Sequence, residues 1–259
     1  MILTRIYPSL HFSPWPIQRA LTILAIITSV IIIIKTRISI LLFLRLFSLI
    51  FLTNFWLKDI IIESSGGEYT LQTLDNIKYG LSLFIFSEVI LFLSFLWAFL
   101  HYSFSPSVLE GHIWPSYSVI PIKGGGLPLI NTALLLSRGV TVTWRHHQLI
   151  SGNKKEAILG LVFTIILGSI FLINQGIELQ EASFSIRDGT FGRVFLTLTG
   201  LHGRHVLVGL ILLIGNLKRV IQNQLTSTAH TGIEISIWYW HFVDVVWIFV
   251  YSLIYWWGA

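Results

Sequence analysis

Long apolar segments repeat along almost the whole chain, and this pattern constrains the fold more than any other feature of the sequence. About 20 consecutive, mainly apolar residues are needed to cross the hydrocarbon core of a bilayer. The segments reach this length and are separated by short polar stretches, which leaves no room for a large soluble domain. Charged residues make up only 11% of the 259 residues, well below the usual share in a soluble domain. The sequence therefore predicts a membrane protein that crosses the bilayer several times.

Seven segments are predicted to be transmembrane helices within a single transmembrane domain that covers residues 1–259, so the predicted fold class is all-α. Their expected ranges are about 15–34, 38–62, 72–104, 127–150, 154–181, 190–222 and 232–257. Seven spans place the two termini on opposite sides of the membrane. Lys and Arg are then more numerous on the side of the N-terminus, which favours an N-terminus inside and a C-terminus outside.

The composition argues against several classes of function. The net charge of +5 comes from basic residues scattered singly between apolar segments, which is not the basic stripe of a nucleic-acid-binding protein. The chain has no cysteine, and its one methionine is the first residue. This excludes disulfides and thiolate metal sites, and it argues against thioether ligation of haem or copper.

Glu88 lies in the middle of the apolar segment "GLSLFIFSEVILFLSFLWAF" (80–99). An ionisable residue inside a membrane span is a functional candidate by default. Gly80, Ser87 and Ser94 recur at seven-residue spacing, and we expect this stripe to pack against another helix with Glu88 beside it, facing the bundle. Two interpretations remain open: a proton-relay or ligand carboxylate, or a protonated or paired carboxyl that fixes the helix register.

Two histidines lie on one predicted helix face in "LTGLHGRHVLVG" (198–209), because His202 and His205 are three residues apart. Gly203 and Gly209 would allow another helix to approach. Hydrogen bonds from the histidines to Glu88 or to a lipid head group are the favoured interpretation. Ligation of a metal or haem is the alternative, although no matching histidine pair is evident elsewhere.

The last predicted helix carries His241 and Asp244, which can pair at i, i+3 spacing. Such a pair would offset part of the cost of burying Asp244. A structural pair that ties the last helix into the bundle is favoured over a role in transport.

Several segments together resemble the family of subunit III of mitochondrial cytochrome c oxidase, in family order from about residue 13 to the C-terminus. These segments are "SPWP" (13–16), "FIFSEVILF" (84–92), "FLWAFLHYSFSPS" (95–107), "LPLINTALLLSRGVTVTWRHH" (127–147), "FSIRDGTFG" (184–192), "LTGLHGRHVLVG" (198–209) and "WYWHFVDVVWIFVYSLIYWWG" (238–258). The "HGxHV" pattern and the last segment are the most specific.

The resemblance implies a 2+5 arrangement of seven helices around a lipid-filled, V-shaped cleft, with Trp56, Glu63 and Arg219 at matching lipid-binding positions. It implies a non-redox core subunit of complex IV, which reduces O2 with electrons from cytochrome c and pumps protons. In that family haem a, haem a3 and the copper centres lie in partner subunits I and II. The subunit stabilises subunit I, binds phospholipid and supports proton uptake and oxygen access.

The resemblance also implies the mitochondrial inner membrane, with the N-terminus in the matrix and the C-terminus in the intermembrane space. The expected partners are subunits I and II, accessory subunits, phospholipids and a respiratory supercomplex, with no nucleic acid. Glu88 matches a family carboxylate that lies outside the accepted proton pathways.

Two other functions are alternatives to this one. The first is an independent proton-coupled transporter that uses the buried polar residues Glu88, His202, His205 and Asp244. The second is a membrane cytochrome with two histidine ligands.

Overall fold

The structure, a computed structural model, describes residues 12–117, 119–150, 153–225 and 231–258, and within these ranges it contains helices and no strand. The elements are α1 (Trp15–Thr36), α2 (Ile40–Ser65), α3 (Leu71–Phe104), the short 3-10 helix η1 (Val108–Glu110), α4 (Leu127–Ile150), α5 (Lys154–Glu181), α6 (Gly189–Ile221), α7 (Thr231–Val250) and the π-helical η2 (Tyr251–Trp257). The predicted all-α fold class is confirmed.

The helices begin and end within about one turn of the predicted ranges. Local sequence explains several of these ends. Proline in the first turn of α1 suits a helix start, because the amide that proline lacks would have no intrahelical partner there. Gly189, with a φ of 77°, turns the chain into α6. This left-handed conformation is strained for residues that carry a Cβ atom and is unstrained for glycine.

Six of the described helices are long and apolar enough to cross a membrane. They are α1, α2, α3, α5, α6 and α7 continued by η2. Helix α4 is the exception, because it carries Arg138 in an otherwise apolar stretch. At 24 residues, α4 is nevertheless roughly 36 Å long, which matches the thickness of a bilayer core.

The chain divides into two compact units, Met1–Ile77 and Lys78–Ala259. The first contains α1, α2 and the first residues of α3, and the second contains the rest of α3 with α4 to α7. This division matches the predicted 2+5 grouping of the helices. The lipid-filled cleft and the single domain remain predictions.

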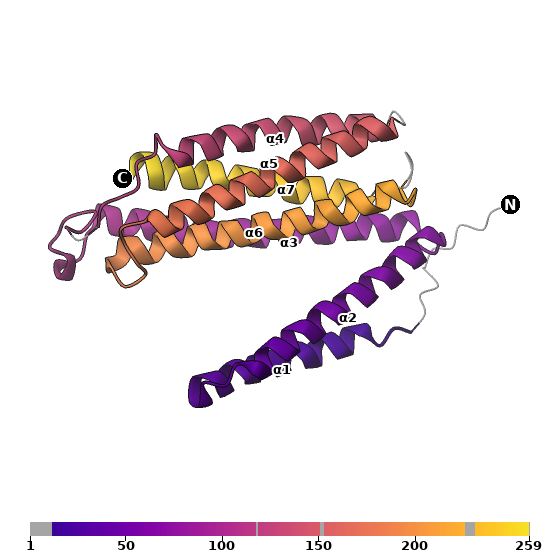
Figure 1. Ribbon diagram of the computed structural model, residues 1–259, viewed down its shortest axis with the longest axis horizontal. Helices are drawn as coiled ribbons and strands as arrows, with labels where there is room; N and C mark the ends of the chain where they lie inside the picture. Colours follow the sequence, from indigo (N-terminus) through magenta and orange to yellow (C-terminus); the bar gives the residue numbers. More distant parts are fainter. Residues whose placement is uncertain (1–11, 118, 151–152, 226–230, 259) are drawn as a thin grey trace. The chain divides into compact units, whose positions relative to one another are not determined.

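The second unit is a bundle in which α4 packs along α5, α5 along α6 and α6 along α7, and α7 returns to contact α4 (Figure 1). Trp240 of α7 fills the centre and is completely buried. Two glycines make room for its indole ring. A Cβ atom would lie 2.9 Å from this ring at Gly168 of α5 and 2.6 Å from it at Gly209 of α6. The predicted close approach at Gly209 is therefore confirmed, whereas Gly203 faces open space.

The prediction for the packing face of α3 was wrong. Gly80, Ser87 and Ser94 are exposed, and the two serine hydroxyls donate to carbonyls of their own helix. The buried face of α3 carries the large side chains Phe92, Leu96 and Phe99 instead. Aromatic side chains bury more area than a small-residue stripe, so they determine which face of this uniformly apolar helix turns inward.

Candidate functional site

Glu88 on α3 is paired with a histidine on α6. His205 Nε2 lies 3.0 Å from Glu88 Oε2, and the ring packs edge-on against Phe92, one turn along α3 from Glu88. His205 Nδ1 lies 2.8 Å from the carbonyl oxygen of Leu201. Because a carbonyl can only accept, Nδ1 carries a hydrogen and donates it there. A single proton then lies between Nε2 and Oε2, and the pair has no net charge whichever group holds that proton.

His202 lies on the same face of α6 but has a different environment. Its Nε2 is 3.3 Å from the carbonyl oxygen of Val243 on α7, to which it donates. The ring is fully buried between Phe171 and Trp247, with ring centroids 5.5 and 5.0 Å away. The structure therefore brings His205, and not His202, to Glu88. It places His202 in the aromatic core.

A second buried pair joins α4 to α7, and sequence reasoning missed one of its members. Arg138 has no exposed surface, and its Nη2 donates to Asp244 Oδ1 at 3.1 Å. The guanidinium also lies over the rings of Phe171 and Trp240, at 4.7 and 4.8 Å from their centroids. Stacking on aromatic faces partly compensates a buried guanidinium for its lost hydration. The signal was present in the sequence, since an arginine within an apolar run is an intramembrane charge.

This ion pair changes the interpretation of Asp244. The partner that the structure gives its carboxylate is Arg138, which is 106 residues away in the sequence. His241 is half-buried one turn earlier on α7, and a pair between His241 and Asp244 remains a prediction. Asp244 ties α7 to α4, which is the structural role expected for it with a different partner.

The three predicted lipid-binding residues are distributed over both units. In the first unit Trp56 of α2 lies under the guanidinium of Arg19, 4.9 Å from ring centroid to Cζ, and Glu63 accepts a 3.0 Å hydrogen bond from the hydroxyl of Tyr69. In the second unit Arg219, near the end of α6, packs against Gly232 at the start of α7, where a Cβ atom would be 2.7 Å from Arg219 Nη1. A lipid site that combines these residues remains a prediction.

Tyr69 lies between α2 and α3, outside the membrane-spanning segments. Its pKa is raised to about 12, first because burial disfavours the phenolate and then because Glu63 accepts its hydrogen bond and repels the negative charge. The nearby charge of Glu68 adds to this shift in the pKa of Tyr69. Tyr69 is therefore a neutral donor at physiological pH.

Comparison with known proteins identifies the family. A family model described as cytochrome c oxidase subunit III matches residues 6–259. The chain belongs to the cytochrome c oxidase subunit III family. Cytochrome c oxidase subunit 3 of Latimeria chalumnae is 45% identical over 249 residues, which is 95% of each chain. The subunits 3 of Squalus acanthias and Pelomedusa subrufa are 44% and 43% identical over 248 residues, again 95% of each chain.

In this member of the subunit III family, two pairs of polar side chains join helices in the interior of the second unit. No three His, Asp or Glu side chains within the described ranges converge in a group that could hold a metal ion. Glu88 with His205 joins α3 to α6, and Arg138 with Asp244 joins α4 to α7. In chemical terms the first pair can share one proton, and the second is a buried ion pair with a 3.1 Å hydrogen bond from Arg138 to Asp244.

Proposed function

We propose that the chain is a non-redox core subunit of cytochrome c oxidase, the respiratory complex IV of the mitochondrial inner membrane. The complex reduces O2 to water with electrons from cytochrome c and pumps protons, with haem a, haem a3 and copper held by partner subunits I and II. The observation that carries this proposal is the family match over residues 6–259.

Within the complex, the proposed role of the chain is to stabilise subunit I and to support proton uptake and oxygen access. The buried pairs support a scaffold role. Glu88 shares its proton with a histidine whose other nitrogen is already committed to a backbone carbonyl. A proton relay through the ring needs a basic group beyond Nδ1 that can take up the proton. The Leu201 carbonyl accepts the hydrogen bond from Nδ1 but is too weak a base to take the proton.

The same geometry disfavours a haem site on α6. His202 uses Nε2 for the Val243 carbonyl and lies between two aromatic side chains, and His205 uses Nε2 for Glu88. Each histidine would have to give up this hydrogen bond to present Nε2 to an iron atom. An anchoring role for both residues fits their surroundings better.

Phospholipid binding belongs to the same proposal. Arg219 is half-buried near the end of α6, where a cation can pair with an anionic head group at the membrane surface. With the N-terminus in the matrix and the C-terminus in the intermembrane space, Arg219 would face the matrix side. Trp56 and Glu63 are the proposed contacts on α2, and accessory subunits and a respiratory supercomplex are the proposed further partners.

The test is gentle purification of the chain in mild detergent, followed by optical spectroscopy and identification of the proteins that co-purify. The proposal expects haem a absorption bands together with two larger hydrophobic subunits. A colourless protein that purifies alone and moves protons across vesicle membranes would indicate a transporter instead. Haem b retained by the isolated chain would indicate a cytochrome and would also overturn the proposal.

A further inference from the structure

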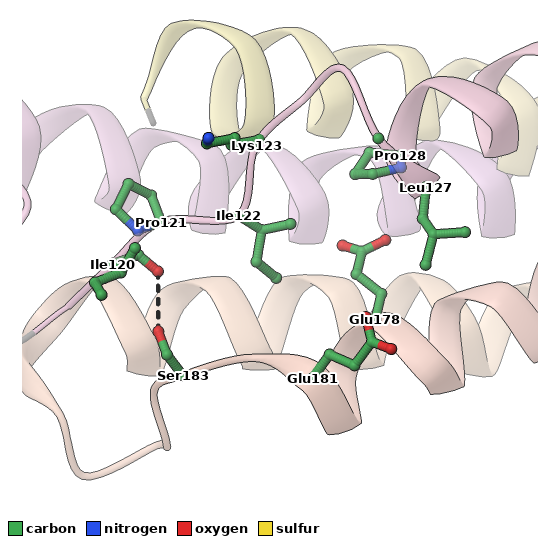
Figure 2. Close-up of a pocket in the computed structure, with 10 residues that line it drawn as sticks. Ile120, Pro121, Ile122, Lys123, Leu127, Pro128, Glu178, Glu181 and Ser183 are labelled. Atoms are coloured by element: carbon green, nitrogen blue, oxygen red, sulfur yellow. Dashed lines mark hydrogen bonds between the residues drawn. The ribbon is translucent and has the colours of Figure 1, made fainter.

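A pocket of about 360 Å³ lies at one end of the second unit, where the segment 120–126 passes over the start of α4 and the end of α5 (Figure 2). Its walls are mainly apolar, formed by Ile120, Ile122, Leu127 and neighbouring prolines. Ser183, just after α5, donates a 3.2 Å hydrogen bond to the carbonyl oxygen of Ile120 and holds the segment in place. The pocket is thus built by two separate parts of the chain, 120–128 and 178–183.

Glu178 is the unusual member of this pocket. Its carboxyl group rises from α5 toward the space between Ile122 and Leu127 (Figure 2). The residue is only 3% exposed. Its carboxylate faces the hydroxyl of Tyr255, a neutral donor, and no basic side chain pairs with it among the described residues. A buried carboxylate without a positive partner costs several kcal/mol, so the pocket favours an occupant that brings positive charge and donors.

The other carboxylates of the second unit show how exceptional Glu178 is. Glu88 and Asp244 are also withdrawn from the surface, and each has a basic partner on another helix. Glu181 lines the same pocket but is exposed, so water can satisfy it. Among these four, Glu178 is the one that is buried without a basic partner in the described part of the chain.

The pocket's shape and lining indicate the class of ligand. A divalent metal ion prefers six or more oxygen ligands, and the pocket offers one buried carboxylate. A quaternary ammonium prefers an aromatic cage, and none of the lining residues is aromatic. A primary ammonium has three N–H donors for the two oxygens of Glu178, and a short alkyl stem would fit the apolar walls. Lys123, exposed on the covering segment, could pair with a phosphate attached to that stem.

We propose that this pocket binds a primary ammonium group on a short alkyl stem, held by the carboxylate of Glu178. The ammonium belongs either to the head group of a phosphatidylethanolamine molecule in the membrane or to a free amine. This site is separate from the lipid site proposed for Trp56, Glu63 and Arg219, because every residue that lines it lies in 120–128 or 178–183.

The experiment uses the intact complex that contains the chain, stripped of exchangeable lipid and placed in nanodiscs of phosphatidylethanolamine or of phosphatidylcholine with the same acyl chains. Phosphatidylcholine is the matched probe because its nitrogen has no N–H. Native mass spectrometry measures how much of each lipid is retained by the wild type, Glu178→Gln and the control Glu181→Gln. Loss of a charge-assisted contact should lower retention of phosphatidylethanolamine in Glu178→Gln by about tenfold, with Glu181→Gln close to the wild type.

A second measurement needs no folded variant other than the wild type. Infrared spectroscopy should show the Glu178 carboxyl ionised in phosphatidylethanolamine and protonated in phosphatidylcholine, and free ethanolamine should restore the ionised form if the pocket accepts a free amine. If phosphatidylethanolamine gives the ionised form and free ethanolamine does not, the ammonium belongs to the lipid head group. Equal retention of both lipids, or a Glu178 carboxyl that stays protonated with every probe, would overturn the proposal and leave only a pocket filled by water.

Discussion

The two units of the chain have similar apolar composition but differ in how they are held together. In α1 the only buried residue is Ser29, and the described residues of α2 include none. The second unit instead has a continuous core that runs from Phe92 on α3 to Tyr255 on η2. The first unit is therefore a pair of helices joined by polar contacts, with apolar surfaces left for lipid or other chains, and the second has a packed interior of its own.

Two groups of polar contacts join α1 to α2 in the first unit. Arg45 of α2 donates through Nη1 to the Ala25 carbonyl and to the hydroxyls of Thr28 and Ser29, at 2.8 and 2.7 Å from the two hydroxyls. At the other end of the pair, Trp15 donates to Asp59 at 2.6 Å. The comparison predicts that unpairing a polar group is most damaging where the surrounding core is fully packed.

The largest expected effect is therefore in the second unit. Asp244→Leu leaves the guanidinium of Arg138 buried without its carboxylate, and it should lower the free energy of unfolding by about 3–5 kcal/mol. Titration of the detergent-solubilised chain with SDS, followed by tryptophan fluorescence, measures this loss. The double variant Arg138→Met with Asp244→Leu should recover most of the stability, because it removes both charges. A double variant as unstable as the single one would contradict the account.

A smaller effect is expected in the first unit. Arg45→Met removes the contacts to α1 but leaves the hydroxyls of Thr28 and Ser29 bonded to their own helix, so the association of α1 with α2 should weaken by about 1–2 kcal/mol. Spin labels on cysteines introduced into α1 and α2 would report a broader distance distribution, since the chain has no cysteine of its own. Lys58→Met on exposed α2 surface is the matched control. An unchanged distribution in Arg45→Met would show that polar contacts do not hold the pair together.

A local contact should contribute less. Glu110 of η1 accepts 2.7 Å hydrogen bonds from the amide and the hydroxyl of Thr190 at the start of α6, where a carboxylate is favoured by the helix dipole. Glu110→Ala should destabilise this helix end by about 1 kcal/mol and speed hydrogen exchange at the Thr190 amide by about fivefold. Glu110→Gln retains an acceptor, so its exchange rate at the Thr190 amide should fall between the rates of the wild type and Glu110→Ala. Identical exchange in all three proteins would refute the capping role.

The smallest effect concerns pH. The pKa of Tyr69 is about 12 in the folded chain and near 10 for an unfolded tyrosine. Its contribution to stability is therefore fully present below pH ~10 and is lost as pH rises toward ~12. The difference in tyrosinate absorption between the wild type and Tyr69→Phe should show a transition near the upper value. A transition near pH 10 would mean that neither the burial of Tyr69 nor its contact with Glu63 is maintained in solution.

Helix bounds were predictable from sequence because span length and apolar composition fix them. The rotation of α3 about its own axis was not predictable, because its residues are apolar on nearly every face. The prediction that Gly80, Ser87 and Ser94 form the packed stripe was therefore wrong. Size rather than polarity decided the inward face there, with Phe92 and Phe99 buried.

The partners of buried polar residues could be predicted only as candidates. His205 was one of two candidates for Glu88, and choosing between residues three apart requires the rotation of α6 relative to α3. The i, i+3 spacing on α7 favours His241 as the partner of Asp244, whereas Arg138, its partner in the structure, comes from α4. Glu178 lies in no sequence motif that marks it as a site residue. Its burial could not be predicted, because it depends on how the segment 120–126 folds over α5.

The central claim is that the buried pairs of this chain hold helices together and do not carry out chemistry. Oxygen consumption by the assembled oxidase with Glu88→Gln tests it most directly, because the glutamine amide can still donate to His205 Nε2 but cannot release a proton. With subunit content verified, we expect turnover to change by less than about twofold, whereas loss of a group that transfers protons in the reaction lowers rates by ~100-fold or more. A fall of that size would contradict the account and make Glu88 part of the proton chemistry.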